Sequence, residues 1–166
     1  MNSLRFEKRQ LNFLSNILGC NSSLILYLCK NLEDYYSFWP ETKKDKITGN
    51  IKTYADGTPK KRIIRPSYGS LKKIQRSIKT KILPTELLPK NIHGGVKKKS
   101  NITNAKAHQG NKYVFATDLQ DFFPNINYKQ VYSMFLTRGY SNYIAHWLTK
   151  LTTYAFELPQ GTGVVL

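Results

Sequence analysis

Residues 113–125 read YVFATDLQDFFPN, and this stretch decides how the rest of the chain is interpreted. Uncharged residues that favour β-strands lead directly into the carboxylate of Asp118, and two aromatic residues and a proline follow. We therefore expect a strand over 113–118 that presents Asp118 at its end, where a carboxylate can bind a metal ion. The spacing alone also allows a simpler interpretation, in which Asp118 only caps the next turn.

The composition indicates a folded domain. The chain has 166 residues, of which 40% are hydrophobic and 13% aromatic, enough for one core. No apolar run approaches the roughly 20 residues that span a bilayer, and the first residues lack the apolar segment of a signal peptide. We interpret Cys20 and Cys29 as reduced core residues of a cytoplasmic protein. A zinc site that adds His93 and His108 would have enough ligands, but no pair has zinc-finger spacing.

Positive charge is concentrated in one region. The net charge is +16, and residues 41–112 hold 19 of the 26 Lys and Arg but 4 of the 10 Asp and Glu. An imbalance of this length, with tyrosines interleaved, favours a polyphosphate partner such as nucleic acid over a merely solvated face. A membrane surface is less favoured because Gly and Pro interrupt the region, which has no long amphipathic helix.

The first part of the chain is expected to be helical. Leucines at helical spacing predict a helix over 4–18. A second helix is expected to run to about residue 32, with Ser22 or Ser23 as its N-cap. The aromatic residues of 35–39 are expected to pack this helical lobe.

A basic hairpin and a basic helix are expected next. Residues 47–66 predict a β-hairpin with its turn at Asp56-Gly57. Ser70 is expected to cap an amphipathic helix that ends near residue 83, before a proline. The apolar side of this helix is formed by Leu71, Ile74, Ile78 and Ile82, and its other sides are basic. The hairpin and helix together would make a lobe that contacts phosphates.

The remaining elements surround residues 113–125. Residues 84–112 are rich in loop-forming residues, and we assign hydrogen-bonding or structural roles to His93 and His108. Asn127 and Ser141 are each expected to cap a helix with a buried apolar stripe.

The acids near the centre point to metal chemistry. Asp118 and Asp121 lie at a strand end, where their side chains need not converge as a general acid and base. Mg²⁺ prefers oxygen ligands and is often bound by one or two carboxylates together with substrate phosphates. A magnesium site that faces the basic lobe is therefore the preferred interpretation.

Several separated motifs resemble bacterial reverse transcriptases, and most closely those of retrons. The motifs are RIIRP at 62–66 after Lys52 and Gly57, LKKIQR at 71–76, NAKAH at 104–108, DLQDFFPNI at 118–126 and LPQG at 158–161. The NAxxH pattern favours retron enzymes over group II intron or other defence-type reverse transcriptases. The resemblance implies an α/β (α+β) fold with a helical lobe over 1–45, basic fingers over 46–112 and a partial palm over 113–166.

The resemblance also implies an activity, RNA-directed DNA synthesis from deoxynucleoside triphosphates with Mg²⁺, and roles for individual residues. Asp118 would be the catalytic aspartate and would bind metal together with the Leu119 carbonyl. Phe123 would exclude a ribose 2′-OH. The implied nucleotide-binding residues are Arg62, less securely Lys52 or Lys60, and also Asp121, Phe122, Phe123 and Gln160. The implied contacts to the RNA template come from Arg65, Lys72, Lys73, Arg76, Lys97, Lys98 and Lys99.

One part of the family pattern is missing. The second catalytic motif, Tyr-x-Asp-Asp, is expected some tens of residues beyond LPQG, whereas the sequence ends at Leu166. We therefore expect a fragment, a frameshifted reading frame or one subunit of a split enzyme, which would not polymerise alone. A second polypeptide would then supply the rest of the palm and the thumb. The alternative is a non-catalytic RNA-binding protein derived from a reverse transcriptase.

Overall fold

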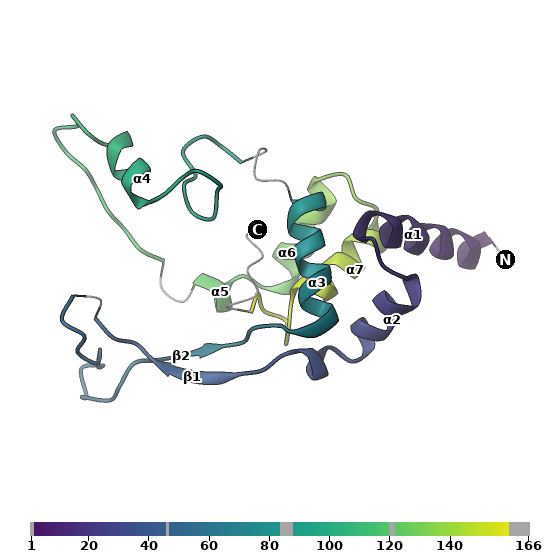
Figure 1. Cartoon of the computed structure of the whole chain (residues 1–166), viewed down its shortest axis with the longest axis horizontal. Coiled ribbons are helices and arrows are strands. Elements are labelled where there is room, and N and C mark those ends of the chain that lie inside the picture. The colour runs from purple at the N-terminus through teal and green to yellow at the C-terminus, as the bar shows by residue number, and fades with distance from the viewer. Residues whose placement is uncertain (1, 46, 84–87, 120–121, 160–166) are drawn as a thin grey trace.

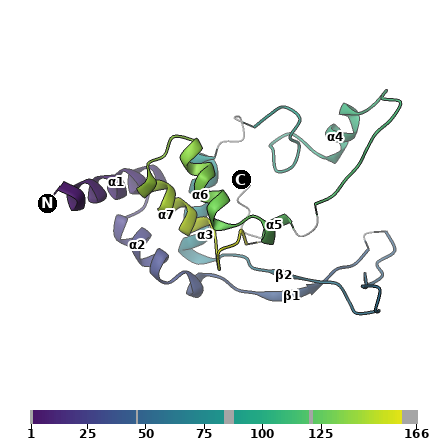
Figure 2. The same ribbon diagram turned by 180° about the vertical axis from the view of Figure 1, so that it is seen from behind.

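The computed structural model describes residues 2–45, 47–83, 88–119 and 122–159, and it has a mixed α+β fold. A body of packed helices carries two extensions that project to the same side, a β-hairpin and an arm that contains α4 (Figures 1 and 2). The expected α+β class is confirmed at this level. The core draws on helices from all three sequence ranges, 1–45, 46–112 and 113–166, so the division into those ranges stays a prediction.

The first helices form where the leucine spacing predicted them. Helix α1 spans Asn2–Leu18 and α2 spans Ser22–Lys30, followed by a short 3₁₀ helix, η1, over Leu32–Tyr35. The expectation that Ser22 or Ser23 caps α2 is wrong. Asn21 has the extended backbone of an N-cap, and its side chain accepts a hydrogen bond from the Ser23 N–H at 3.0 Å.

The basic helix is interrupted near its end. Helix α3 spans Gly69–Ser77 and continues as a π-helical segment, η2, over Ile78–Ile82. Ser70 lies inside α3 and does not cap it, because the extended residue before the helix is Tyr68. The apolar stripe is confirmed, since all four of its members, Leu71, Ile74, Ile78 and Ile82, are buried.

The two helices after residue 126 match their expectations closely. Helix α6 spans Tyr128–Thr137, and Asn127 and Gln130 form a reciprocal capping box at its start. Helix α7 spans Asn142–Thr152 and is capped by Ser141, whose hydroxyl accepts from the Ile144 N–H. Helix α7 packs against α1, α2, α3 and α6, so it lies at the centre of the helical body.

The hairpin pairs a different first strand from the expected one. Strand β1 spans Trp39–Thr42 and pairs antiparallel with β2, Lys61–Ile64. Residues 43–45 and 47–60 belong to the tip, where Gly57 has a positive φ in the expected Asp56-Gly57 turn. The aromatic residues of 35–39 are thus not all packing residues. Trp39 begins the strand and is 46% exposed, whereas Tyr36 is buried.

The expected strand over 113–118 is not present. Residues 113–119 have no regular secondary structure and are exposed, with Phe115 91% accessible. A strand needs a neighbour to accept and donate its ladder hydrogen bonds. Within the described part of the chain, no strand lies beside 113–119, so the apolar sequence alone does not produce one.

The arm that precedes this segment is short of buried contacts. It contains α4, Asn101–Ala107, with a Ser100–Thr103 capping box, and none of its described residues is buried. His93 Nδ1 lies 2.9 Å from Thr103 Oγ1, which confirms a hydrogen-bonding role for His93. The last short helix, α5, spans Phe122–Asn125 and follows Asp118 along the chain.

A buried glutamine joins the hairpin to the helical body. Gln75 of α3 is 1% exposed, and its Nε2 donates to the Tyr36 hydroxyl at 3.0 Å and to the Leu151 carbonyl at 2.9 Å. Its Oε1 accepts from the Ser67 hydroxyl. Because Tyr36 and Ser67 lie at the bases of β1 and β2, this one side chain fixes both strands against α7.

Among the described residues, no single helix is long and apolar enough to cross a bilayer, and α1 and α2 reach that length only as a pair bent by 97°.

Replacement of Gln75 by Met should destabilise the fold. Methionine fills a similar volume but cannot pair with the two buried hydroxyls or with the Leu151 carbonyl, so several polar groups lose their partner. We expect a loss of about 2–4 kcal/mol in the free energy of unfolding, measured by urea denaturation. Gln109→Met, at an exposed position after α4, is the control and should change stability by less than about 0.5 kcal/mol. Equal stability of the two variants would contradict the role of Gln75.

The stability should fall at high pH because of Cys29. Burial raises the pKa of the Cys29 thiol to about 12, and Lys150 offsets only part of this. An unfolded thiol ionises near pH 8.5, so the folded state keeps a proton that the unfolded state releases as the pH rises. The stabilisation is therefore complete below about pH 8.5 and is lost progressively toward pH 12. Urea denaturation of Cys29→Ala should show a slope with pH that is shallower by up to about 1.4 kcal/mol per pH unit. Cys20→Ala is the comparison: burial also raises the pKa of the Cys20 thiol, but Cys20 is only partly buried, so its removal should change the slope less. An unchanged slope in Cys29→Ala would contradict this prediction.

Candidate functional site: a basic cleft beside Asp118

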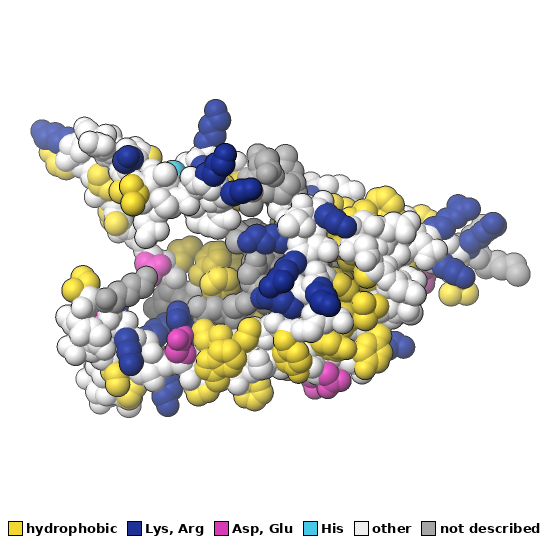
Figure 3. Space-filling model, in the orientation of Figure 1, with side chains coloured by type: hydrophobic (Ala, Val, Ile, Leu, Met, Phe, Trp, Pro, Cys, Tyr) yellow, Lys and Arg dark blue, Asp and Glu magenta, His cyan; other side chains and the backbone are white. Residues whose placement is uncertain are grey.

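A cleft of about 870 Å³ lies between the hairpin and the segments that contain Asp118, α5 and residues 157–159. Figure 3 shows the molecule hollowed between the hairpin and the arm, with Lys and Arg side chains at its border. The cleft is lined by Lys43, Tyr54, Lys60, Lys61, Arg62, Ile63, Arg65, Asp118, Leu119, Phe122, Phe123, Pro124, Glu157, Leu158 and Pro159. Residues from three of the sequence motifs thus share one space.

Positive charge predominates in the lining. Five of the lining side chains are Lys or Arg, and two, Asp118 and Glu157, are acids. Arg62 extends from β2 opposite Glu41 of β1, and its Nε and Nη2 both lie 2.6 Å from Glu41 Oε2. The antiparallel register places these two residues directly across from each other, which brings their side chains together on one face.

Arg65 connects the base of the hairpin to the turn after α7. Its Nη1 lies 3.3 Å from Glu157 Oε2, and its guanidinium carbon lies 5.8 Å from the centre of the Tyr154 ring. The Arg65 side chain is 29% exposed, so it is both a lining residue and a structural contact. Its predicted contact with an RNA template remains untested.

The donors for a metal ion fit magnesium in type. Asp118 and Leu119 both line the cleft, and a carboxylate and a backbone carbonyl are oxygen ligands of the kind that Mg²⁺ prefers. In the described part of the chain, no group of three or more His, Cys, Asp or Glu side chains could hold a metal ion. The residues present therefore fit a magnesium ion that takes its other ligands from substrate phosphates and water.

Two aromatic rings form the wall next to Asp118. Phe122 and Phe123 have ring centroids 5.6 Å apart in an edge-to-face arrangement, and both line the cleft. Phe122 is 45% exposed, whereas Phe123 is half-buried. The role of Phe123 as a steric filter stays a prediction.

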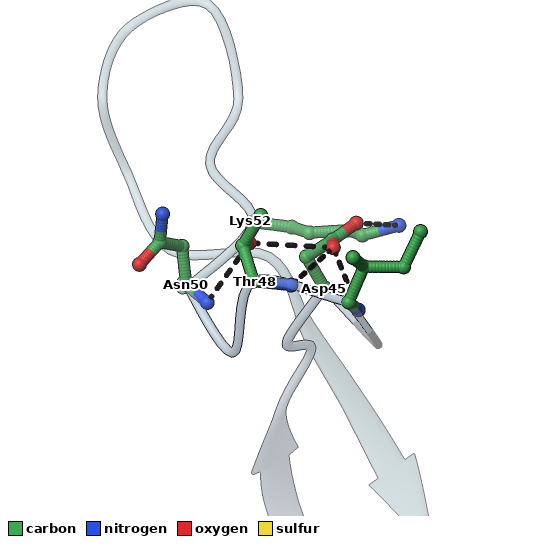
Figure 4. Close-up of polar contacts among 5 residues, drawn as sticks. Asp45, Thr48, Asn50 and Lys52 are labelled. Carbon is green, nitrogen blue, oxygen red and sulfur yellow. Dashed lines mark hydrogen bonds and ion pairs between the residues drawn. The ribbon is translucent and has the colours of Figure 1, made fainter.

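Lys52 lies at the tip of the hairpin and outside the cleft. Its Nζ lies 3.6 Å from Asp45 Oδ2, and Asp45 also accepts from the Thr48 and Ile47 N–H groups at 3.0 Å (Figure 4). These backbone hydrogen bonds, that of Thr48 first, lower the pKa of Asp45. The other candidate, Lys60, lines the cleft, with its Nζ 5.2 Å from the centre of the Tyr54 ring.

The predicted template-binding lysines and Arg76 lie away from the cleft. Lys72, Arg76 and Lys79 form a cluster of cations along α3 and η2. The pKa of Lys72 is lowered mainly by burial, and the nearby charges of Arg76 and Lys79 lower it further. Lys73 and Arg76 are exposed. In the arm, Lys97 and Lys98 are exposed, whereas the Lys99 ammonium donates to the Lys90 and Ile92 carbonyls and supports the loop. Two further candidates, Asp121 and Gln160, lie outside the described residues.

Sequence reasoning missed several residues in or next to the cleft. Glu41, the partner of Arg62, was missed because the hairpin was expected to begin at residue 47, beyond the true first strand. The four residues Trp39-Pro40-Glu41-Thr42 are too few and too mixed in polarity to identify a strand from the sequence. Lys43, Lys61 and Tyr54 could have been found only from the pairing of the two strands.

The α+β body thus carries a cleft that is lined mainly by cations and has Asp118 in the wall opposite the hairpin. The sequence is similar to several curated proteins of one class. Over 166 residues the chain is 31% identical to the Retron Se72 reverse transcriptase of Salmonella heidelberg (strain 579083-10). The aligned region covers 97% of this chain and 40% of that relative. It is 35% identical over 148 residues to the Retron Mx162 reverse transcriptase of Myxococcus xanthus, and 38% identical over 68 residues to the Retron Ec86 reverse transcriptase of Escherichia coli.

These similarities confirm the resemblance to retron reverse transcriptases that the motifs indicated. The match to the Myxococcus relative covers 86% of this chain and 27% of the relative. The match to the Escherichia coli relative covers 41% of this chain and 21% of the relative. The chain therefore spans about two fifths of the length of the Salmonella relative and less of the others. No family model matches the sequence.

The contact between Arg65 and Glu157 should stabilise the hairpin base. A double-mutant cycle of Arg65→Ala and Glu157→Ala should give a coupling of about 0.5–1 kcal/mol in urea denaturation, because the pair is only partly exposed. The Lys52–Asp45 pair is the matched control. It is longer and more exposed, and its coupling should be below about 0.5 kcal/mol. Coupling energies in the reverse order would show that Arg65 is not held by Glu157.

Proposed function

We propose that this chain provides the nucleotide- and template-binding part of an RNA-directed DNA polymerase of the retron type. The observation that carries the proposal is the cleft, which brings together Arg62 of the RIIRP motif, Asp118 and Phe123 of the DLQDFFPNI motif, and Leu158 of the LPQG motif. These motifs lie far apart in the sequence, and chance similarity of separate motifs gives no reason for them to line one space.

In this proposal the hairpin and α3 are the fingers, and the segment from Asp118 through α7 to residue 159 is part of the palm. The helices of residues 1–45 are a supporting lobe. The support comes from the position of the cleft, which lies between the hairpin and the Asp118 segment. A nucleotide placed there would contact both parts at once.

The cations of the cleft are assigned to the triphosphate of the incoming nucleotide. Arginine suits this task because its planar guanidinium offers several donors to phosphate oxygens, whereas lysine acts as a compact positive charge. Arg62 is the main candidate, and Lys60 is preferred over Lys52 because Lys60 lines the cleft. The backbone amides of Asp121 and Phe122 are further candidates, and Gln160 is assigned to the nucleotide pocket.

Asp118 and the Leu119 carbonyl are assigned to Mg²⁺. When bound, the ion would neutralise charge that develops on the transferred phosphoryl group. The protein's own contribution is to place a carboxylate opposite the cations, so that a metal-bound triphosphate is attracted from both walls. Phe123 is assigned to the exclusion of the ribose 2′-OH.

The RNA template is assigned to cations outside the cleft. The exposed residues Lys73, Arg76, Lys97 and Lys98 are candidates, together with half-buried Lys72 and Lys99 and the cleft residue Arg65. Because the α3 cluster is separate from Asp118, the second candidate function remains: RNA binding that needs no catalysis. The two candidates differ in whether a nucleotide also binds in a metal-dependent way.

RNA binding and nucleotide binding should respond to different substitutions. In Lys73→Gln/Arg76→Gln, affinity for a single-stranded RNA should fall, and the slope of log affinity against log salt should decrease in magnitude by about 1.4, the value for two lost phosphate contacts. Fluorescence anisotropy at several salt concentrations measures this. Lys8→Gln/Arg9→Gln on α1 removes the same charge from a distant helix and should change the slope little.

Asp118→Asn should retain RNA binding and lose the increase in deoxynucleoside triphosphate affinity that Mg²⁺ produces in the unsubstituted chain. Calorimetric titration with and without Mg²⁺ measures this difference. If Mg²⁺ never increases nucleotide affinity while RNA still binds, the non-catalytic RNA-binding function is the correct one. If neither ligand binds, both candidate functions fail.

A further inference from the structure

The hydrogen bonds of Arg62 leave one edge of its guanidinium for a ligand. Nε and Nη2 form one edge of the planar group, and both lie 2.6 Å from a single oxygen of Glu41. The donors of Nη1, and the outer donor of Nη2, lie on the other edges and are not used by Glu41. The guanidinium is thus held by one edge, with further N–H groups still able to donate.

The cleft contains Arg62 but not Glu41. Arg62 is a lining residue, whereas Glu41 is not, although the two side chains are in contact. Glu41 therefore holds Arg62 from outside the cleft. The strand register fixes this arrangement, because the two residues are directly paired between β1 and β2.

Glu41 is expected to have two opposing effects on an anion in the cleft. Its negative charge repels the anion, but its two short contacts limit the conformations of a long side chain that would otherwise sample many rotamers. Both side chains are close to half exposed, so solvent screens the repulsion. The orientation effect does not depend on screening. We therefore expect the orientation of Arg62 by Glu41 to outweigh the repulsion between Glu41 and the anion.

We propose that Glu41 is a positioning residue: it holds the Arg62 guanidinium by its Nε edge so that the remaining donors face a phosphate in the cleft. This inference rests on the proposed function, because it takes the cleft to be a polyphosphate site. It adds a residue to that site that no sequence motif contains. It also makes a specific claim, that removal of an acidic side chain weakens the binding of an anion, because the oxygen acceptor that holds Arg62 is lost with it.

Binding of inorganic triphosphate to the 166-residue chain tests this inference, with isothermal titration calorimetry as the measurement. Glu41→Ala should weaken binding by about threefold to tenfold, since Arg62 loses its orientation. In an Arg62→Ala background, Glu41→Ala should have no further effect. Glu41→Gln keeps an oxygen acceptor and loses only the charge, so it should bind as tightly as the unsubstituted chain or more tightly. Glu33→Ala, an exposed acid outside the cleft, is the charge control and should not weaken binding.

A second measurement separates orientation from a general loss of structure. In an NMR spectrum of nitrogen-bound protons, the Arg62 Nε–H should be protected from exchange in the unsubstituted chain and in Glu41→Gln, and unprotected in Glu41→Ala. The other folded-state signals should be unchanged, because a half-exposed pair contributes little to stability.

The possible results are distinguishable. Binding by Glu41→Ala that equals or exceeds that of the unsubstituted chain would overturn the inference and identify Glu41 as a competitor for Arg62. If the unsubstituted chain binds triphosphate but Arg62→Ala binds equally well, the inference fails while the cleft can still bind through its lysines. If the unsubstituted chain does not bind triphosphate, the proposed nucleotide site fails, and this inference fails with it.

Discussion

The arrangement of the cleft depends on the buried amide of Gln75. The hairpin itself is two strands of four residues each, which is too little to be stable or to hold an orientation alone. Gln75 joins the bases of both strands to the Leu151 carbonyl in α7, and all of these groups are removed from water. A buried network of this kind resists rearrangement, because a partner that moved away would leave a polar group without a hydrogen bond. The cations of β2 therefore have a fixed direction relative to the helices.

Acidic residues determine how the cations of the hairpin are presented. Arg62 is held by Glu41 and Arg65 by Glu157, and each pair connects two separate segments of the chain. The lysines of the cleft differ, since their flexible side chains contribute charge more than geometry. The site thus combines two oriented guanidinium groups with a set of adaptable positive charges. This is a suitable environment for a triphosphate, whose oxygens can be bound both by directed hydrogen bonds and by a general field.

The helices and the second strand of the hairpin were predictable from the sequence, whereas the first strand was not. Local signals determine α6 and α7, because Asn127 and Ser141 cap helices whose apolar stripes are then buried. The strands depend on pairing between distant residues. Trp39 was interpreted as part of an aromatic cluster, and only its pairing with Ile64 shows that it begins β1. The composition of 113–118 favours a strand, but strand propensity reflects packing against neighbours, and no strand lies beside these residues in the described part of the chain.

The same distinction applies to the site. The family motifs pointed to Asp118, Arg62 and the two phenylalanines as residues of one site, and these four residues line one cleft, whereas their roles stay predictions. It could not find Glu41 or separate Lys60 from Lys52, since those distinctions depend on which side of the hairpin a residue faces. Lys52 has a counterion in Asp45 at the tip, whereas Lys60 lines the cleft. Such differences follow from strand register, which a one-residue shift would reverse.

The two walls of the cleft are held to very different degrees, and this has a consequence for binding. The cationic wall is fixed by cross-strand hydrogen bonds, two ion pairs and the Gln75 network. The opposite wall begins with residues 113–119, which are exposed and make no regular backbone pairing. Segments with few buried contacts open at low free-energy cost, so the position of Asp118 is the less constrained of the two. In the proposed function, the cations would therefore meet a polyphosphate in fixed positions, whereas the Asp118 carboxylate could still adjust to the bound ligand.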